Sequence, residues 1–151
     1  FIHRNIANLV PPYNPDGDHH GTSAAVEYAL KTLQVAHIII LGHSHCGGIK
    51  SGYKLFCSNQ ISHESIFVNK WLDILKPAYA NISKNINRFD EGNNADLEKE
   101  SIKFSLNNLT DFPFVKSALN KKELVLHGLW HDIGSGALEA LDPISMNFKK
   151  I

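Results

Sequence analysis

The sequence predicts an α/β fold in which a mostly parallel central β-sheet is flanked by helices and ends in a C-terminal β-hairpin. Residues 35–41 form a short, isoleucine-rich apolar run, which is typical of a strand covered on both faces. Segments with helical spacing of apolar residues stand before and after this run, and such alternation favours a parallel sheet. Near the end, residues 134–136 read Gly-Ser-Gly between two apolar stretches, which is typical of a hairpin.

The first part of the chain predicts a strand end, a loop, a helix and a strand. The first four residues have the pattern of the end of a short strand, and the proline-rich residues 11–18 are typical of a loop. Thr22 or Ser23 can cap a helix that runs to about Gln34, because the apolar residues that follow recur at helical spacing. The isoleucine-rich strand then leads directly into a glycine-rich turn.

The rest of the chain predicts further helices and the hairpin. Residues 64–87 carry a helical pattern that Pro77 can kink or divide. Pro113 can open another helix in its first turn. The remaining segments are a loop at 85–94, helices at 96–109 and 112–119, a strand at 123–133 and its return strand at 137–141.

Composition indicates a single globular domain over residues 1–151. Fifteen basic and fifteen acidic side chains cancel, so no nucleic-acid partner is expected. No apolar run approaches the roughly 18 residues of a transmembrane helix, so no membrane partner is expected. Cys46 and Cys57 are the only cysteines, which indicates a reducing, cytoplasmic location. Because the sequence starts in mid-pattern at Phe1, we expect the domain to be N-terminally incomplete.

The turn after the isoleucine-rich strand carries a candidate metal site. The run Gly42-His43-Ser44-His45-Cys46-Gly47-Gly48 follows the carboxyl end of a strand, where open α/β sheets place their chemistry. His43 and Cys46 are both zinc-ligand types, but a catalytic zinc usually takes three protein ligands. The alternative interpretation is a buried cysteine beside a hydrogen-bonded turn histidine. Cys57 is a weak candidate for a third ligand, because predicted helix separates it from Cys46.

Other chemistry-bearing residues have simpler interpretations. A Cys–His nucleophile pair is the other function open to the turn, but spacing of three residues on a tight turn favours a shared metal. No phosphate-binding loop, dinucleotide fingerprint or serine nucleophile elbow occurs. His45 is expected at the surface, and Trp71 and Trp130 in the core. Structural or solvent-exposed roles are expected for His19, His20, His37, His127 and His131.

Five blocks of the sequence form a recognisable set, namely Arg4–Tyr13, Gly21–Ala29, Ile38–Ile49, Ser105–Val115 and Leu126–Ile133. In this order they resemble the β-class carbonic anhydrases, and the Pro-Pro-Tyr ending of the first block is similar to the branch with the plant and many bacterial enzymes. The resemblance covers almost the whole chain. It therefore implies the β-carbonic anhydrase fold.

The resemblance also implies a site. His43 and Cys46 match two of the family's zinc ligands, and one Zn²⁺ per subunit is implied. Phe1, Ile6 and Tyr28 match the apolar lining of a substrate pocket that partly crosses a dimer interface, and the backbone N–H of Gly47 matches a group that contacts substrate. The implied reaction is the reversible hydration of carbon dioxide to bicarbonate and a proton, in a homodimer or homotetramer.

One family motif does not occur. The first zinc-binding cysteine of the family lies in a Cys-x-Asp-Ser-Arg motif upstream of the position that matches Phe1, and no Cys-x-Asp occurs here. The family's catalytic Asp and Arg belong to the same motif and are therefore also missing. The sequence alone does not decide whether these 151 residues are active. That motif lies on a strand between residues 1–4 and residues 35–41 in the family sheet. Without it, neighbouring ladder groups lose their partners, each at about 1–3 kcal/mol if buried.

The function therefore has one leading interpretation and two alternatives. The leading one is a zinc carbonic anhydrase whose natural chain includes the upstream motif. The first alternative is a truncated, non-catalytic homologue. The second is hydrolysis of carbonyl sulfide or carbon disulfide on the same scaffold, which would depend on the shape of the pocket.

Overall fold

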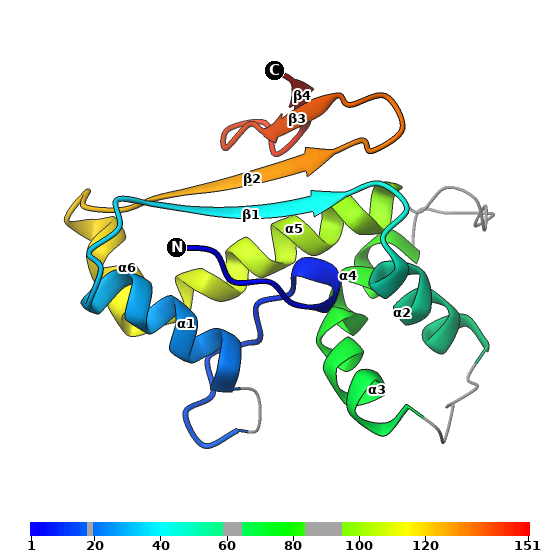
Figure 1. Cartoon of the computed structure of the whole chain (residues 1–151), viewed down its shortest axis with the longest axis horizontal. Coiled ribbons are helices and arrows are strands. Elements are labelled where there is room, and N and C mark those ends of the chain that lie inside the picture. The colour runs from blue at the N-terminus through cyan, green and yellow to red at the C-terminus, as the bar shows by residue number, and fades with distance from the viewer. Residues whose placement is uncertain (18–19, 59–64, 84–94) are drawn as a thin grey trace.

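A four-stranded sheet lies along one side of the molecule, and the helices lie along the other (Figure 1). The computed structural model describes residues 1–17, 20–58, 65–83 and 95–151. The strand order is β1-β2-β3-β4. The strands are β1 (His37–His43), β2 (Val125–His131), β3 (Leu138–Leu141) and β4 (Phe148–Lys150).

The sheet combines one parallel pair with two antiparallel pairs. β1 and β2 run parallel, with His37 opposite Val125 and His43 opposite His131. β3 pairs antiparallel with β2, and β4 pairs antiparallel with β3. The predicted α/β class is confirmed, but parallel pairing is confined to β1 and β2 in the described sheet. The short turns that join the last three strands allow only antiparallel neighbours, whereas the β1–β2 connection contains helices.

The helices that the spacing of apolar residues predicts are present among the described residues. Pro77 lies in the second position of α4, so the long helical pattern is divided before it, and Pro113 opens α6. None of the described helices is both long and apolar enough to cross a membrane. The helices are α1 (His20–Lys31), α2 (Gly47–Ser58), α3 (Ile66–Leu72), α4 (Lys76–Ser83), α5 (Ala95–Thr110) and α6 (Pro113–Asn120), with 3₁₀ turns η1 (Ile6–Asn8) and η2 (Asp73–Leu75).

Helix α5 covers one face of the sheet, and glycines allow the close approach. A Cβ at Gly42 in β1 would lie 2.7 Å from Cδ1 of Ile102 in α5, and one at Gly128 in β2 would lie 2.9 Å from Cγ2 of the same side chain. Residues of opposite parity in β1 point to the other face. There Ile39 and Leu41 are 55% and 54% exposed. The prediction that both faces of this strand are covered is therefore wrong for the described chain.

Two predictions for the start of the chain, a strand end and the bounds of a helix, are also wrong. No ladder is formed by residues 1–4 in the described sheet, because an extended segment becomes a strand only with a neighbour to pair with. Helix α1 begins at His20 rather than after a Thr22 cap, and it ends at Lys31. Gln34 adopts a left-handed φ of 52°, which terminates the helix before it.

The hairpin is confirmed, and a further strand follows it. The Asp132 N–H donates to the Ala137 carbonyl at 2.8 Å, and Gly136 supplies the left-handed φ of 73° in the turn. Strand β4 was not predicted, because residues 148–150 are too short and polar to show alternation. The predicted loop at 85–94 lies outside the described residues.

Candidate metal site

β1 presents His43 at its carboxyl end with a defined tautomer. The ring is half-buried, and its Nδ1 lies 2.9 Å from the backbone oxygen of Ser44. A carbonyl oxygen can only accept, so Nδ1 donates and carries the proton. In the neutral imidazole this leaves Nε2 as the unprotonated nitrogen, which is the atom available to bind a metal.

The turn from Ser44 to Cys46 places the cysteine at the start of α2. His45 has a left-handed φ of 57° and is exposed, as predicted. Cys46 is 5% exposed and precedes the first residue of α2, Gly47. Its backbone N–H donates to Oε1 of Glu98 at 3.0 Å. One imidazole nitrogen and one buried thiol therefore project from a single turn, and both are donor types that zinc prefers.

Glu98 lies under this turn, in the first helical turns of α5. It is only 2% exposed, and its second oxygen, Oε2, accepts from the Trp130 indole N–H at 3.0 Å. Both carboxylate oxygens therefore have a donor, as buried polar atoms require. The amino end of α5 further stabilises negative charge at this position.

A second network holds the other side of the turn. The Ser44 hydroxyl donates to Oδ1 of Asp132 at 3.0 Å and accepts from the Ile133 N–H at 2.9 Å. The Ser44 N–H donates to the backbone oxygen of His131 at 2.8 Å. Hydrogen bonds from Ser135, Ser44 and the Gly134 N–H hold the pKa of Asp132 below its usual range.

The start of α2 also contacts the 3₁₀ turn η1. A Cβ at Gly48 would lie 2.7 Å from Cγ2 of Ile6 and 3.0 Å from the backbone nitrogen of Ala7. The Trp71 indole N–H donates to the Ile6 backbone oxygen at 2.8 Å and so fixes this turn from α3. Of the predicted pocket residues, Ile6 therefore packs against Gly48 in the first turn of α2, whereas an added Cβ at the predicted Gly47 would have no neighbour within 4 Å.

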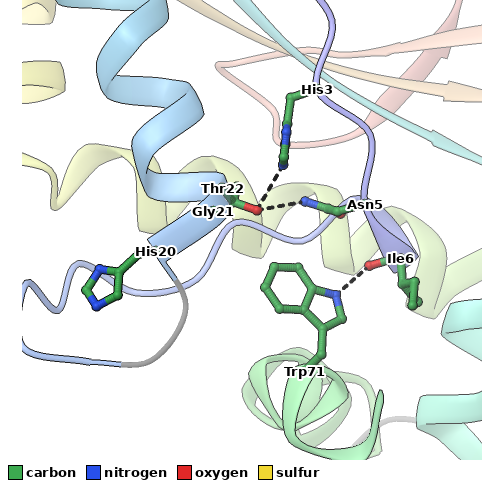
Figure 2. Close-up of a pocket in the computed structure, with 7 residues that line it drawn as sticks. All are labelled: His3, Asn5, Ile6, His20, Gly21, Thr22 and Trp71. Carbon is green, nitrogen blue, oxygen red and sulfur yellow. Dashed lines mark hydrogen bonds between the residues drawn. The ribbon is translucent and has the colours of Figure 1, made fainter. Parts of the chain in front are cut away.

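A cavity of about 420 Å³ lies next to η1, and its lining residues are drawn in Figure 2. The Thr22 hydroxyl lies at its wall, 3.0 Å from His3 Nε2 and 3.2 Å from the Asn5 side-chain nitrogen. Its lining residues are His3, Asn5, Ile6, His20, Gly21, Thr22 and Trp71. Only Ile6 among the predicted site residues lines it, so the cavity does not surround His43 or Cys46.

The remaining two predicted pocket residues form a pair of their own. The rings of Phe1 and Tyr28 lie 5.9 Å apart between centroids, and the side chains are 70% and 50% exposed. The structure thus places His43 and Cys46 on one turn, Ile6 beside the start of α2, and Phe1 against Tyr28. Their roles in zinc and substrate binding stay predictions.

A third zinc ligand is not supplied by the described residues. Within them, no group of three or more His, Cys, Asp or Glu side chains is arranged to hold a metal. Cys57 lies eleven residues beyond Cys46 along α2, which corresponds to about 16 Å of helix. Its thiol contacts the Tyr79 hydroxyl at 3.1 Å, an interaction that raises the pKa of Tyr79. Cys57 is therefore not the missing ligand on this turn.

Sequence reasoning missed the residues that support the turn. Asp132 had a usable signal, since it follows β2 directly and the carboxyl ends of parallel neighbours meet at one edge. No sequence signal pointed to Glu98, because 52 residues separate it from Cys46 and only folding brings the two together. Trp130 was predicted to be a core aromatic and is 7% exposed, but its hydrogen bond to Glu98 was not predicted.

The sequence matches a protein-family model described as carbonic anhydrase over residues 1–138. The fold points to the β class within it, because the solved structures that it resembles include β-carbonic anhydrases. With the β-carbonic anhydrase CcaA it shares 32% identity at a TM-score of 0.88, covering 100% of this chain and 71% of that one. The chain therefore belongs to the β-carbonic anhydrase family.

Other relatives agree with this assignment. Beta carbonic anhydrase 3 of Arabidopsis thaliana is 36% identical over 140 residues, which is 92% of this chain. The chain spans 54% of the length of that relative. One of two tetrameric β-carbonic anhydrases from Sordaria macrospora is 29% identical with a TM-score of 0.73, covering 93% of this chain and 67% of that one.

Proposed function

We propose that the protein catalyses the reversible hydration of carbon dioxide to bicarbonate and a proton with one bound Zn²⁺ per subunit. The observation that carries this proposal is the turn between β1 and α2. There, an Nδ1-anchored imidazole and a buried thiol stand on one turn of a chain that belongs to the β-carbonic anhydrase family. The nitrogen and sulfur donors fit zinc.

In this proposal, the residues of the chain hold and orient the metal. His43 contributes Nε2, and its Nδ1–H bond to the Ser44 carbonyl keeps the ring from rotating. Cys46 contributes its thiolate from a position shielded from water. Bound zinc supplies the Lewis acidity that makes water a nucleophile near neutral pH. The start of α2, with the Gly47 N–H and the Ile6 side chain, provides the surface for a small apolar substrate.

The proposal requires partners for His43 and Cys46. We propose that a third protein ligand and the Asp/Arg pair of the family come from outside the residues described here. We also propose that the protein is a homo-oligomer, because its structural neighbours include tetrameric β-carbonic anhydrases. Light scattering on the purified natural protein measures this, and a monomer would contradict it.

A non-catalytic homologue is the second candidate function. It is favoured by one observation, which is that the described residues contain no group of three metal-binding side chains. Such a protein would bind another subunit without binding zinc. It predicts no hydration activity in the purified natural protein.

Substitutions in the turn separate the two candidates. We expect His43→Ala and Cys46→Ser to abolish carbon dioxide hydration, because each removes a zinc ligand. His45→Asn is the matched control, since His45 lies between the ligands, is exposed, and has a left-handed φ that asparagine tolerates. Stopped-flow hydration assays measure the rates, with circular dichroism to verify the fold. Equal activity in all four proteins would overturn the proposal.

A further inference from the structure

Glu98 is a buried acid whose partners are both neutral N–H groups. One is the backbone N–H of Cys46, and the other is the indole N–H of Trp130, each 3.0 Å from a different carboxylate oxygen. Burying a carboxylate is unfavourable unless donors replace the water that it loses. A glutamine in this position would present an amide NH₂ to one of the two donors. The geometry therefore calls for a side chain that only accepts.

A lysine strengthens the second of these hydrogen bonds. Nζ of Lys99 lies 4.3 Å from the centroid of the Trp130 ring and 2.7 Å from Oε2 of Glu139. A cation over the ring face draws electron density toward itself, and this makes the indole N–H a better donor to Glu98. Glu98 is thus held from β2 as well as from its own helix α5.

This arrangement anchors the second end of the ligand-bearing turn. Ser44 is fixed at the first end by the His131 carbonyl and Asp132, and Cys46 is fixed at the second end by Glu98. Holding the backbone nitrogen of Cys46 sets the direction of its Cα–Cβ bond, and with it the direction of the thiol. A metal ligand whose orientation is fixed by its surroundings binds more tightly than a free one.

We propose that Glu98 is a positioning residue for Cys46, which it holds in the orientation that zinc binding needs. The inference rests on the proposed function, because it assumes that Cys46 binds zinc. Glu98 itself has no contact with the metal in this proposal, and it acts through the Cys46 N–H alone.

Four variants of the natural protein test this. Glu98→Leu removes both acceptors. Glu98→Gln leaves one carbonyl oxygen, for which the Cys46 and Trp130 N–H groups compete. Trp130→Phe removes the competing donor, so the double variant Glu98→Gln/Trp130→Phe returns the carbonyl oxygen to Cys46. Trp130→Phe alone is the control, because it keeps the carboxylate on Cys46.

The readouts are the Zn²⁺ dissociation constant, from competition with a chelator, and the thiolate-to-metal absorption of the Co²⁺-substituted protein. We expect Glu98→Leu and Glu98→Gln to weaken zinc binding by about 10-fold to 100-fold and to alter the cobalt spectrum. The double variant should recover most of the affinity that Glu98→Gln loses. General destabilisation would instead make the double variant worse than either single one.

The outcomes distinguish this inference from the proposed function. Wild-type protein that binds no zinc through His43 and Cys46 overturns both. Zinc binding that is tight in wild type and unchanged in both Glu98 variants overturns the positioning role alone. A double variant that binds more weakly than Glu98→Gln, in step with a lower melting temperature, also overturns it. If Glu98→Leu does not fold, the two glutamine variants carry the test.

Discussion

Two adjacent glycines at the start of α2 have different roles although their sequence context is nearly the same. Gly47 has open space around the position of an added Cβ, whereas one at Gly48 would lie 2.7 Å from Ile6 and 3.0 Å from the Ala7 backbone. Backbone atoms cannot move aside as a flexible side chain does. Gly48 therefore allows η1 to pack against the turn that carries His43 and Cys46.

We expect Gly48→Ala to lower the free energy of unfolding by about 1–3 kcal/mol, because the new methyl group overpacks this contact. Gly47→Ala is the matched control, and it should change stability by at most about 1 kcal/mol, as an exposed helical glycine does. Urea denaturation of the two variants measures the difference. Equal stabilities would show that η1 does not pack closely on α2.

Asp132 gives the ligand-bearing turn a pH dependence. Hydrogen bonds from Ser135, Ser44 and the Gly134 N–H lower its pKa in the folded protein. A carboxyl whose folded pKa is depressed contributes stability above its unfolded pKa of about 3.9 and loses that contribution as the pH falls through the folded value. The Ser44–Asp132 contact is therefore expected to weaken only in acid.

We expect Asp132→Asn to flatten the acid side of the stability profile. Wild type should lose stability more steeply than the variant as the pH falls below about 4, because only wild type takes up a proton at this position. Urea denaturation at a series of pH values measures the slopes. Asp142 is the comparison. The pKa of Asp142 is also lowered, in this case by Lys149, but Asp142 lies in the β3–β4 turn. Parallel profiles for wild type and Asp132→Asn would contradict the role of Asp132.

Among the secondary-structure elements, α5 organises the site through buried polar side chains on one helix, namely Glu98, Ser105 and Asn108. Ser105 accepts from the Val10 N–H and donates to the Asn8 carbonyl, both at 3.1 Å, and the Asn108 side chain donates to the Val10 carbonyl at 2.8 Å. The same helix carries Glu98 under Cys46. α5 thus fixes the segment after η1 and the start of α2 together, beneath β1 and β2 (Figure 1).

Asn108→Ala should lower the free energy of unfolding by about 1–3 kcal/mol, because it leaves the buried Val10 carbonyl without its donor. Asn107→Ala removes the same side chain from the exposed neighbouring position, where we expect a change within about 0.5 kcal/mol. Thermal and urea unfolding compare the two. An equal loss of unfolding free energy in both variants would mean that the Asn108 side chain does not hold Val10 in place.

The helices and the first hairpin could be predicted from local signals. Apolar spacing, Pro77 and Pro113 predicted helices close to their observed positions, and the glycines at 134–136 predicted the turn. Pairing is not local, so residues 1–4 were wrongly predicted as a strand, and β4 was missed. The prediction that the second face of β1 is covered was also wrong for the described residues. The composition of a strand does not show what packs on it.

At the scale of the whole molecule, the candidate site depends on segments that are far apart in the sequence. The His43–Cys46 turn is held by Glu98 from α5, by Asp132 after β2 and by η1 through Gly48. The turn itself was predictable, because its ligand types stand at the end of a strand. Of its supports, Asp132 had a local signal in its place directly after β2, whereas the hydrogen bond between Cys46 and Glu98 spans 52 residues and could not be predicted from a single sequence.

Zinc content per subunit, measured by elemental analysis on the purified natural protein, shows whether the His43–Cys46 turn holds a metal. We expect a value near one in wild type and near zero in His43→Ala and Cys46→Ser. The His45→Asn control should keep the wild-type value. A wild-type value near zero, with zinc supplied during expression, would overturn the proposed zinc site and favour a non-catalytic member of the family.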